Sequence, residues 1–123
     1  MSMEFTLKKY RELLVALKDA GYQCAGRPYQ GAGTDRYLLL RHDVDLCPNY
    51  SLRVARIEAE LDMQAIYYFR AVPESWDGDV ILQIRRLGHE IGYHYESLTT
   101  CNGDVDAAYQ DFICNLNRLS ALM

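Results

Sequence analysis

The sequence has no long hydrophobic run and no block of like charges. Its 123 residues carry 13 Lys and Arg against 17 Asp and Glu, a formal net charge of −4. A helix that spans a bilayer needs about 20 consecutive apolar residues, and no segment approaches that length. Dispersed, weakly acidic charge also argues against nucleic acid or an anionic membrane as the main partner. We therefore expect neither nucleic acid nor a membrane among the partners.

The first 20 residues lack the uncharged core of a secretory signal peptide, because charged side chains interrupt every apolar stretch. The four cysteines form no C-x-x-C pair and are irregularly spaced. This usage is typical of reduced thiols in a cytosolic protein, and it disfavours a disulfide framework or a four-cysteine zinc site. These absences predict a cytoplasmic location. The cysteines are Cys24, Cys47, Cys101 and Cys114.

Internal repeats and low-complexity segments are also absent, and the length favours a single domain over residues 1–123. Thr6 can cap a first amphipathic helix, which Gly21 ends. Residues 23–35 are rich in glycine and are predicted to form a loop. The chain therefore begins with a helix and a loop before any strand.

Three strand–helix units are predicted to follow. Residues 37–41, 65–69 and 89–93 are short apolar runs typical of strands, and the first is apolar enough to be buried on both faces. Helices are expected from about Pro48, Val80 and Asp104. The inward residues expected on the second and last helices are Leu52, Ala55, Ala59, Val105, Ala108, Phe112, Leu116 and Leu119. Such alternation predicts an α/β fold with parallel strands, in an open sheet or a barrel.

Polar clusters stand at the ends of two predicted strands. The first strand ends in Arg-His-Asp-Val-Asp (41–45), and the third is followed by His-Tyr-Glu (94–96). In an extended segment the carboxylates of Asp43 and Asp45 point the same way, and so do the His and Glu of the second segment. Functional residues of parallel α/β folds lie at the carboxyl ends of strands. We expect the two clusters to meet at one rim of the sheet.

Two carboxylates that face a His and a Glu suit Zn²⁺, Mn²⁺, Fe²⁺ or Co²⁺ better than Ca²⁺. A metal would offset the repulsion among the carboxylates, and without one at least one carboxyl should have a raised pKa. Plainer roles exist for the same residues. Asp43 or Asp45 could cap the helix near Pro48, and His94 could be a rim histidine with a backbone partner.

Residues 37–100 resemble the N-terminal part of the polysaccharide deacetylases, the NodB-like family. Gly88-His-Glu-Ile-Gly-Tyr-His94 is similar to the segment that leads into the family's H-[ST]-x-x-H motif. Ala65-Ile-Tyr-Tyr-Phe69 resembles the strand between the two family motifs, and the 41–45 segment stands where the family has T-F-D-D-G. The resemblance implies a partial (β/α) barrel, with about three parallel strand–helix units preceded by a helix.

Carried over by position, the resemblance implies that Asp43 is the catalytic base and His94 a metal ligand. The family's second Asp falls on Val44, so its metal-binding role moves to Asp45. The family's second histidine falls on Leu98, and Glu96 is the nearest replacement. The implied ligands of a divalent metal, Zn first with Mn, Fe or Co as alternatives, are Asp45, His94 and Glu96.

Four further residues have expected places around this site. Arg41, His42 and Tyr95 are additional candidates at the rim, and Arg41 could hold the base ionised. His89 matches the lead-in histidine of the family and is expected to be structural, since it lies five residues before His94 and faces the opposite side of a strand.

The activity that the resemblance implies is removal of the acetyl group from an N-acetylated sugar, with an oligosaccharide or small molecule as substrate. The family's later strands, which supply an Arg, an apolar wall and a His general acid, have no counterpart here. The chain could be a truncated enzyme, an inactive metal- or sugar-binding module, or another metal-dependent hydrolase of C–N or phosphoester bonds. Bare edges of a parallel sheet also predict self-association, unless the first helix covers the sheet.

Overall fold

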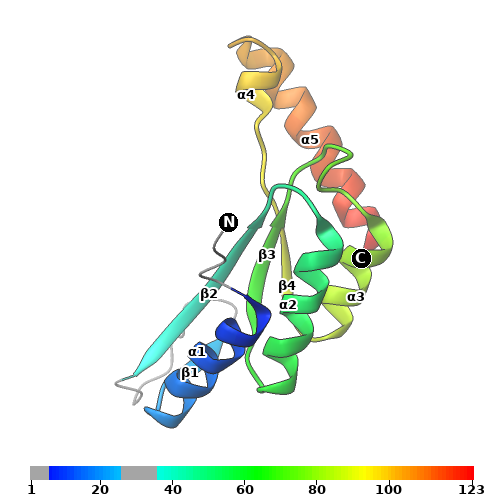
Figure 1. The fold of residues 1–123 in the computed structure, drawn as a ribbon. Helices are drawn as coiled ribbons and strands as arrows, with labels where there is room; N and C mark the ends of the chain where they lie inside the picture. The colour runs from blue at the N-terminus through cyan, green and yellow to red at the C-terminus, as the bar shows by residue number, and fades with distance from the viewer. Residues whose placement is uncertain (1–5, 26–35) are drawn as a thin grey trace.

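The computed structural model describes residues 6–25 and 36–123. Its elements in chain order are α1 (Leu7–Asp19), β1 (Gln23–Ala25), β2 (Tyr37–Val44), α2 (Pro48–Glu60), β3 (Ala65–Phe69), α3 (Gly78–Arg86), β4 (Glu90–Tyr93), α4 (Ser97–Thr100) and α5 (Val105–Leu122). The four strands pair in parallel in the order β1-β2-β3-β4 (Figure 1). The predicted α/β class is confirmed.

Local sequence signals account for where the helices begin and end. The Thr6 side chain accepts a hydrogen bond from the Lys9 backbone N–H, which caps α1 as predicted. The Asp77 carboxylate accepts from two backbone N–H groups at the start of α3. Gly21 and Gly88 follow α1 and α3 with φ of +93° and +103°, a conformation that glycine adopts without strain.

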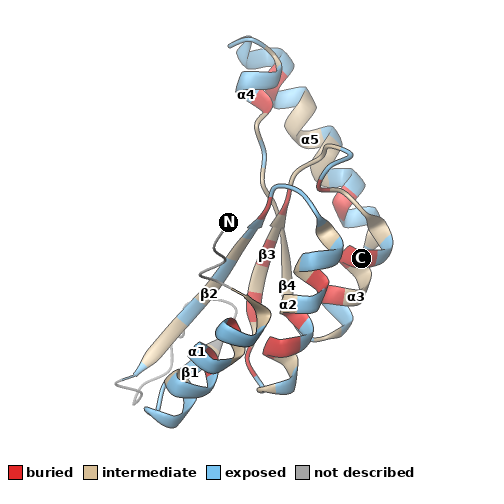
Figure 2. Cartoon of the chain, in the orientation of Figure 1, coloured by how far each residue is buried: buried red, intermediate tan, exposed pale blue. Residues whose placement is uncertain are grey.

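One face of the sheet carries the core. The inward side chains of β3, Tyr67 and Phe69 among them, are fully buried against α2 and α3, together with Leu119 of α5. A second cluster joins α1 to α2 around Leu14. Buried residues gather where these helices meet the strands (Figure 2). We call this side the helix-covered face.

The other side, here the open face, carries Leu39, Arg41 and Asp43 of β2 with Ile66 and Tyr68 of β3. Neither core cluster of the described residues includes a side chain from this face. Leu39 is 44% exposed, and Tyr68 is only partly buried. The prediction that the first strand is buried on both faces is therefore wrong, because α1, α2 and α3 all pack on the helix-covered face.

Three further expectations need correction. Part of the predicted loop 23–35 is strand β1, whereas residues 26–35 lie outside the described part of the chain. The short helix α4 was not predicted. Val105, expected to face inward, is 71% exposed, because the first half of α5 extends with α4 beyond the carboxyl end of the sheet (Figure 1).

All four cysteines lie in the described residues, and none of them forms a disulfide there. Cys24 and Cys101 are partly buried, and the other two are exposed. No helix in residues 6–25 and 36–123 combines the length and the apolar composition needed to cross a bilayer.

Candidate functional site at the carboxyl end of the sheet

Asp45 and His94 meet at the carboxyl end of the sheet. Asp45 directly follows β2, and His94 directly follows β4. The His94 backbone N–H donates to the Phe69 carbonyl over 2.9 Å, which extends the β3–β4 pairing and holds His94 beside the end of β3. His94 Nδ1 lies 3.8 Å from Asp45 Oδ1. The structure thus brings one residue of each predicted cluster together.

The Nδ1 atom of His94 is buried and makes no hydrogen bond to the described residues. At 3.8 Å, the Asp45 carboxylate is too far away to be its hydrogen-bond partner. The rest of the imidazole is reachable, because the side chain is 33% exposed and that of Asp45 is 59% exposed. Buried nitrogens without a hydrogen bond are rare in proteins, and each one calls for an explanation such as a bound ion or water.

Arg70, the first residue after β3, occupies the space between the two clusters. Its Nε and Nη2 donate to the two carboxylate oxygens of Glu96 over 2.8 and 3.1 Å, and its Nη1 donates to the Asp45 carbonyl over 3.2 Å. These charge-assisted hydrogen bonds, which form a bidentate pair, hold the pKa of Glu96 below its usual value. Glu96 therefore faces Arg70, and a metal ligated by Glu96 would have to share an oxygen with the guanidinium.

Asp43 lies on the open face, two residues before Asp45. Arg41 Nε donates to Asp43 Oδ1 over 3.1 Å, and the two side chains are 55% and 41% exposed. The Arg41 guanidinium also lies 4.3 Å from the centre of the Tyr68 ring. The predicted contact between Arg41 and the candidate base is therefore present.

The capping role considered for the two aspartates is not observed. The N-cap of α2 is Cys47, with φ of +54° and no side-chain cap hydrogen bond. In the described part of the chain, neither the Asp43 nor the Asp45 carboxylate accepts a backbone N–H at the start of that helix. The aspartates are left for another role at the rim.

His42 lies away from this site, although the sequence placed it among the rim candidates. Side chains alternate along β2, so His42 points to the helix-covered face while Asp43 points to the open face. Its Nε2 is 2.5 Å from Glu58 Oε2, and its ring stacks on Tyr67 at 4.6 Å between centroids. Tyr95, the other spare rim candidate, is 62% exposed and packs against α5.

Glu58 of α2 is fully buried, which sequence reasoning did not anticipate. Its carboxylate accepts hydrogen bonds from the hydroxyls of Tyr10 and Tyr67 and contacts His42. Burial pushes the pKa of Glu58 upward, but the contacts with His42 and the two tyrosines outweigh it and lower the pKa. The sequence does carry a signal for this burial. Glu58 stands three residues after Ala55, so both side chains lie on the same, inward-facing side of the helix.

His89 has the structural role that the sequence predicted. It is 3% exposed, its Nδ1 accepts the Ala65 backbone N–H over 3.0 Å, and its Nε2 donates to the Ala55 carbonyl over 2.9 Å. Both ring nitrogens are therefore used, and they tie β3 to α2.

Within the described ranges, no group of three or more His, Cys, Asp or Glu side chains is arranged to hold a metal ion. The structure supplies two of the predicted ligands, Asp45 and His94, as neighbours, and turns the third, Glu96, toward Arg70. Arg70 itself was missed by the sequence analysis. Its place directly after a predicted strand, at the same end of the sheet, was the available signal.

Comparison of the chain with protein-family models, with curated proteins and with solved structures finds no match. The interpretation of the site therefore depends on its own geometry and on the motif resemblance.

Proposed function

We propose that this chain carries part of a metal-dependent hydrolase site, of the kind that removes acetyl groups from N-acetylated sugars. The observation that carries the proposal is the unpaired, buried Nδ1 of His94 facing the Asp45 carboxylate at 3.8 Å. An imidazole nitrogen and a carboxylate are ligands that Zn²⁺, Mn²⁺, Fe²⁺ and Co²⁺ accept. A shared cation would occupy the free lone pair of the histidine and balance the charge of the aspartate.

The sheet geometry agrees with this proposal. The polar residues Arg41 and Asp43 lie on the open face, which would form the interior wall if the sheet were part of a (β/α) barrel. The site lies at the carboxyl end of the strands, where barrel enzymes have their catalytic residues. We therefore extend the proposal to the fold, as part of a deacetylase-type barrel.

Asp43 is the proposed general base. Arg41 orients its carboxylate through the 3.1 Å hydrogen bond, and a carboxylate so placed can take a proton from water. The water oxygen then joins the acetyl carbon, the C–N bond breaks, and the proton passes to the departing amine. A bound divalent metal would supply polarisation of the acetamide carbonyl and a lower pKa for the attacking water.

Arg70 is the proposed positioning residue. It holds the Glu96 carboxylate and the Asp45 backbone at once, and so fixes the distance between the segments that follow β2 and β4. Glu96 is proposed as a third ligand through an oxygen shared with Arg70. Replacing Arg70 should therefore loosen the site even though the guanidinium touches no metal.

A second candidate function is binding of a metal or a sugar without turnover. The observation that favours it is the exposure of the rim, since the side chain of Asp45 is 59% exposed and that of Asp43 is 41% exposed. Enzymes that catalyse hydrolysis exclude bulk water from the active site, which strengthens the electrostatic interactions with the substrate. An open rim suits reversible binding.

Metal content after dialysis tests metal binding at Asp45 and His94, which the hydrolase proposal shares with the metal-binding alternative. Wild-type protein equilibrated with Zn²⁺ and then dialysed should retain about one equivalent, because two ligands of the proposed set are already neighbours. Asp45→Asn and His94→Gln should lose it. Asp62→Asn is the matched control, since Asp62 has φ of +61°, which asparagine tolerates. Equal retention by all four proteins would contradict the assignment.

Acetate release separates the two candidates. The enzyme reading expects acetate from an N-acetylglucosamine oligomer with the wild-type protein and none with Asp43→Asn, which should still bind metal. Metal binding with no acetate from either protein would leave the binding reading. Release of phosphate from a phosphoester, with no acetate, would point to a different hydrolase.

A further inference from the structure

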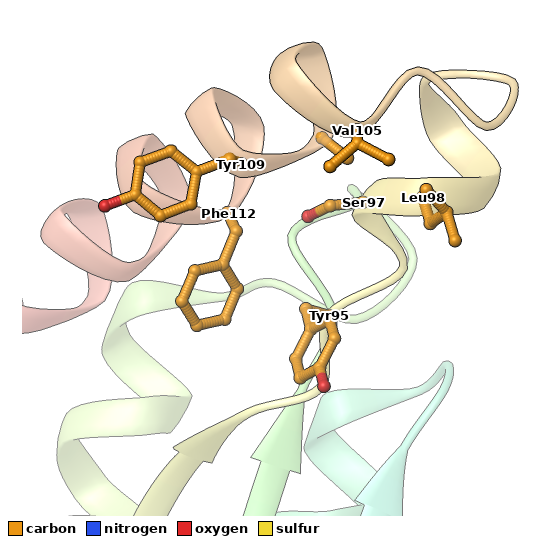
Figure 3. A pocket seen from close by; sticks show the side chains of 7 residues that line it. Tyr95, Ser97, Leu98, Val105, Tyr109 and Phe112 are labelled. Carbon is orange, nitrogen blue, oxygen red and sulfur yellow. The ribbon is translucent and has the colours of Figure 1, made fainter.

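An aromatic pocket of about 330 Å³ lies beside the candidate site, between the segment that follows β4 and the first half of α5 (Figure 3). The residues that line it include Tyr95, Ser97, Leu98, Val105, Tyr109 and Phe112. We refer to it as the aromatic pocket. Its volume falls near the lower end of the range for small-molecule sites, about 300–1,000 Å³.

The walls are aromatic rings that are accessible to a ligand. Tyr95 and Phe112 meet edge to face, with 5.0 Å between their centroids, and Phe112 in turn stacks on Tyr93 at 5.7 Å. Phe112 is therefore held from two sides. Tyr95 and Tyr109 are 62% and 61% exposed. Grouped exposed rings of this kind mark a binding surface more often than scattered ones do.

The floor of the pocket supplies a polar group without a partner. Ser97 is 4% exposed, and its Oγ is buried with no hydrogen bond to the described residues. In Figure 3 this hydroxyl points toward the side of the pocket that Tyr109 and Phe112 form. A buried unpaired hydroxyl is costly, and a ligand with a hydroxyl or amide group would satisfy it.

We infer that the aromatic pocket binds one ring of a sugar chain, an inference that rests on the proposed function and names where the substrate is held. A pyranose has C–H faces that pack on the negative faces of aromatic rings, and hydroxyls around its rim. The pocket offers both complements, with aromatic rings on its walls and the Ser97 hydroxyl at its floor.

The position of the pocket fits a neighbouring ring of the sugar chain rather than the reacting one. Tyr95 stands between His94 and Glu96 in the sequence, and neighbouring side chains of an extended segment point to opposite sides. The pocket thus lies across that segment from the Asp45–His94 pair. A ring held in the pocket would therefore not be the ring at the Asp45–His94 pair.

A second copy of the chain is the rival occupant, because Leu98 and Val105 are 55% and 71% exposed. An apolar surface laid on the pocket would cover these residues. An apolar surface would leave Ser97 Oγ unpaired, however. The polar floor therefore favours a sugar.

The test is a titration of the full chain, with metal removed by EDTA, with the trisaccharide of N-acetylglucosamine and with a glucose trisaccharide, followed by NMR chemical shifts. We expect millimolar binding of at least one of them, with the shifts centred on Tyr109 and Ser97. Tyr109→Ala should weaken binding about tenfold, Tyr109→Phe less than threefold, and Ser97→Ala about fivefold. Tyr22→Ala, at an exposed tyrosine beyond α1, should change nothing.

Failure of this inference can be told apart from failure of the proposed function. Asp45→Asn should lose metal and keep sugar binding, whereas Tyr109→Ala should lose sugar binding and keep metal. No shift with either trisaccharide up to about 20 mM would overturn the inference while leaving the metal site untouched. A self-association that Tyr109→Ala abolishes and sugar does not affect would also overturn it, in favour of the second copy.

Discussion

Two polar clusters belong to this sheet, and they differ in how completely their hydrogen bonds are satisfied. On the helix-covered face, the Glu58 carboxylate is fully buried and is paired with Tyr10, Tyr67 and His42. At the carboxyl end of the strands, His94 keeps a buried nitrogen without a partner, close to an exposed Asp45. A closed network stabilises a fold, whereas an unsatisfied one is typical of a binding site.

The largest expected effect is the loss of the Glu58 carboxylate. Glu58→Ala would leave the hydroxyls of Tyr10 and Tyr67 and the His42 ring without their buried acceptor. We expect a loss of about 3–5 kcal/mol in the free energy of unfolding, measured with urea. Glu60→Ala, on the exposed side of the same helix, should cost less than about 1 kcal/mol. Similar losses in the two variants would show that the buried network does not hold the fold together.

A smaller effect is expected on the open face at Gly92. A Cβ at this position would overlap the Tyr68 ring, which lies across it on the neighbouring strand. We expect Gly92→Ala to destabilise the protein by about 1–3 kcal/mol, and to cost much less when Tyr68→Ala is already present. Equal costs in both backgrounds would mean that the ring is not packed against the sheet.

The smallest effect concerns acid. Because the pKa of Glu58 is lowered by folding, its contribution is fully present above the ordinary glutamate pKa of about 4.3 and is lost as the pH falls through the lower folded value. The urea concentration at the unfolding midpoint of the wild-type protein should therefore decrease once the pH drops below about 4. The Glu58→Gln variant should show a smaller decrease over the same pH range. Glu60→Gln serves as the control. If the urea midpoint of Glu58→Gln decreased with pH as steeply as that of the wild-type protein, the acid sensitivity would come from other carboxyl groups.

Local signals predicted much of the fold. β3 spans the expected residues 65–69, and Thr6 and Gly21 bound α1 as their residue types indicate. The meeting of Asp45 and His94 could also be expected, because parallel strands bring their carboxyl ends to one edge. These features depend on residue type and on spacing along the chain.

Other features depend on contacts between distant segments. β1 is only three residues long and exists through its pairing with residues 37–39 of β2. The partner of His42 on the helix-covered face is a carboxylate sixteen residues away, and Glu96 pairs with Arg70, which follows another strand. Periodicity within a segment says nothing about such partners. The predicted third ligand was assigned by sequence proximity, which ignored the guanidinium at the end of β3.

The most direct test of the contrast between the two clusters is thermal unfolding with and without excess Zn²⁺. We predict that Zn²⁺ raises the Tm of the wild-type protein, since a ligand that binds only the folded state stabilises it. His94→Gln should unfold at nearly the wild-type temperature without metal and should gain nothing from Zn²⁺. A wild-type protein that is indifferent to Zn²⁺, or a His94→Gln variant as unstable as Glu58→Ala, would contradict the account.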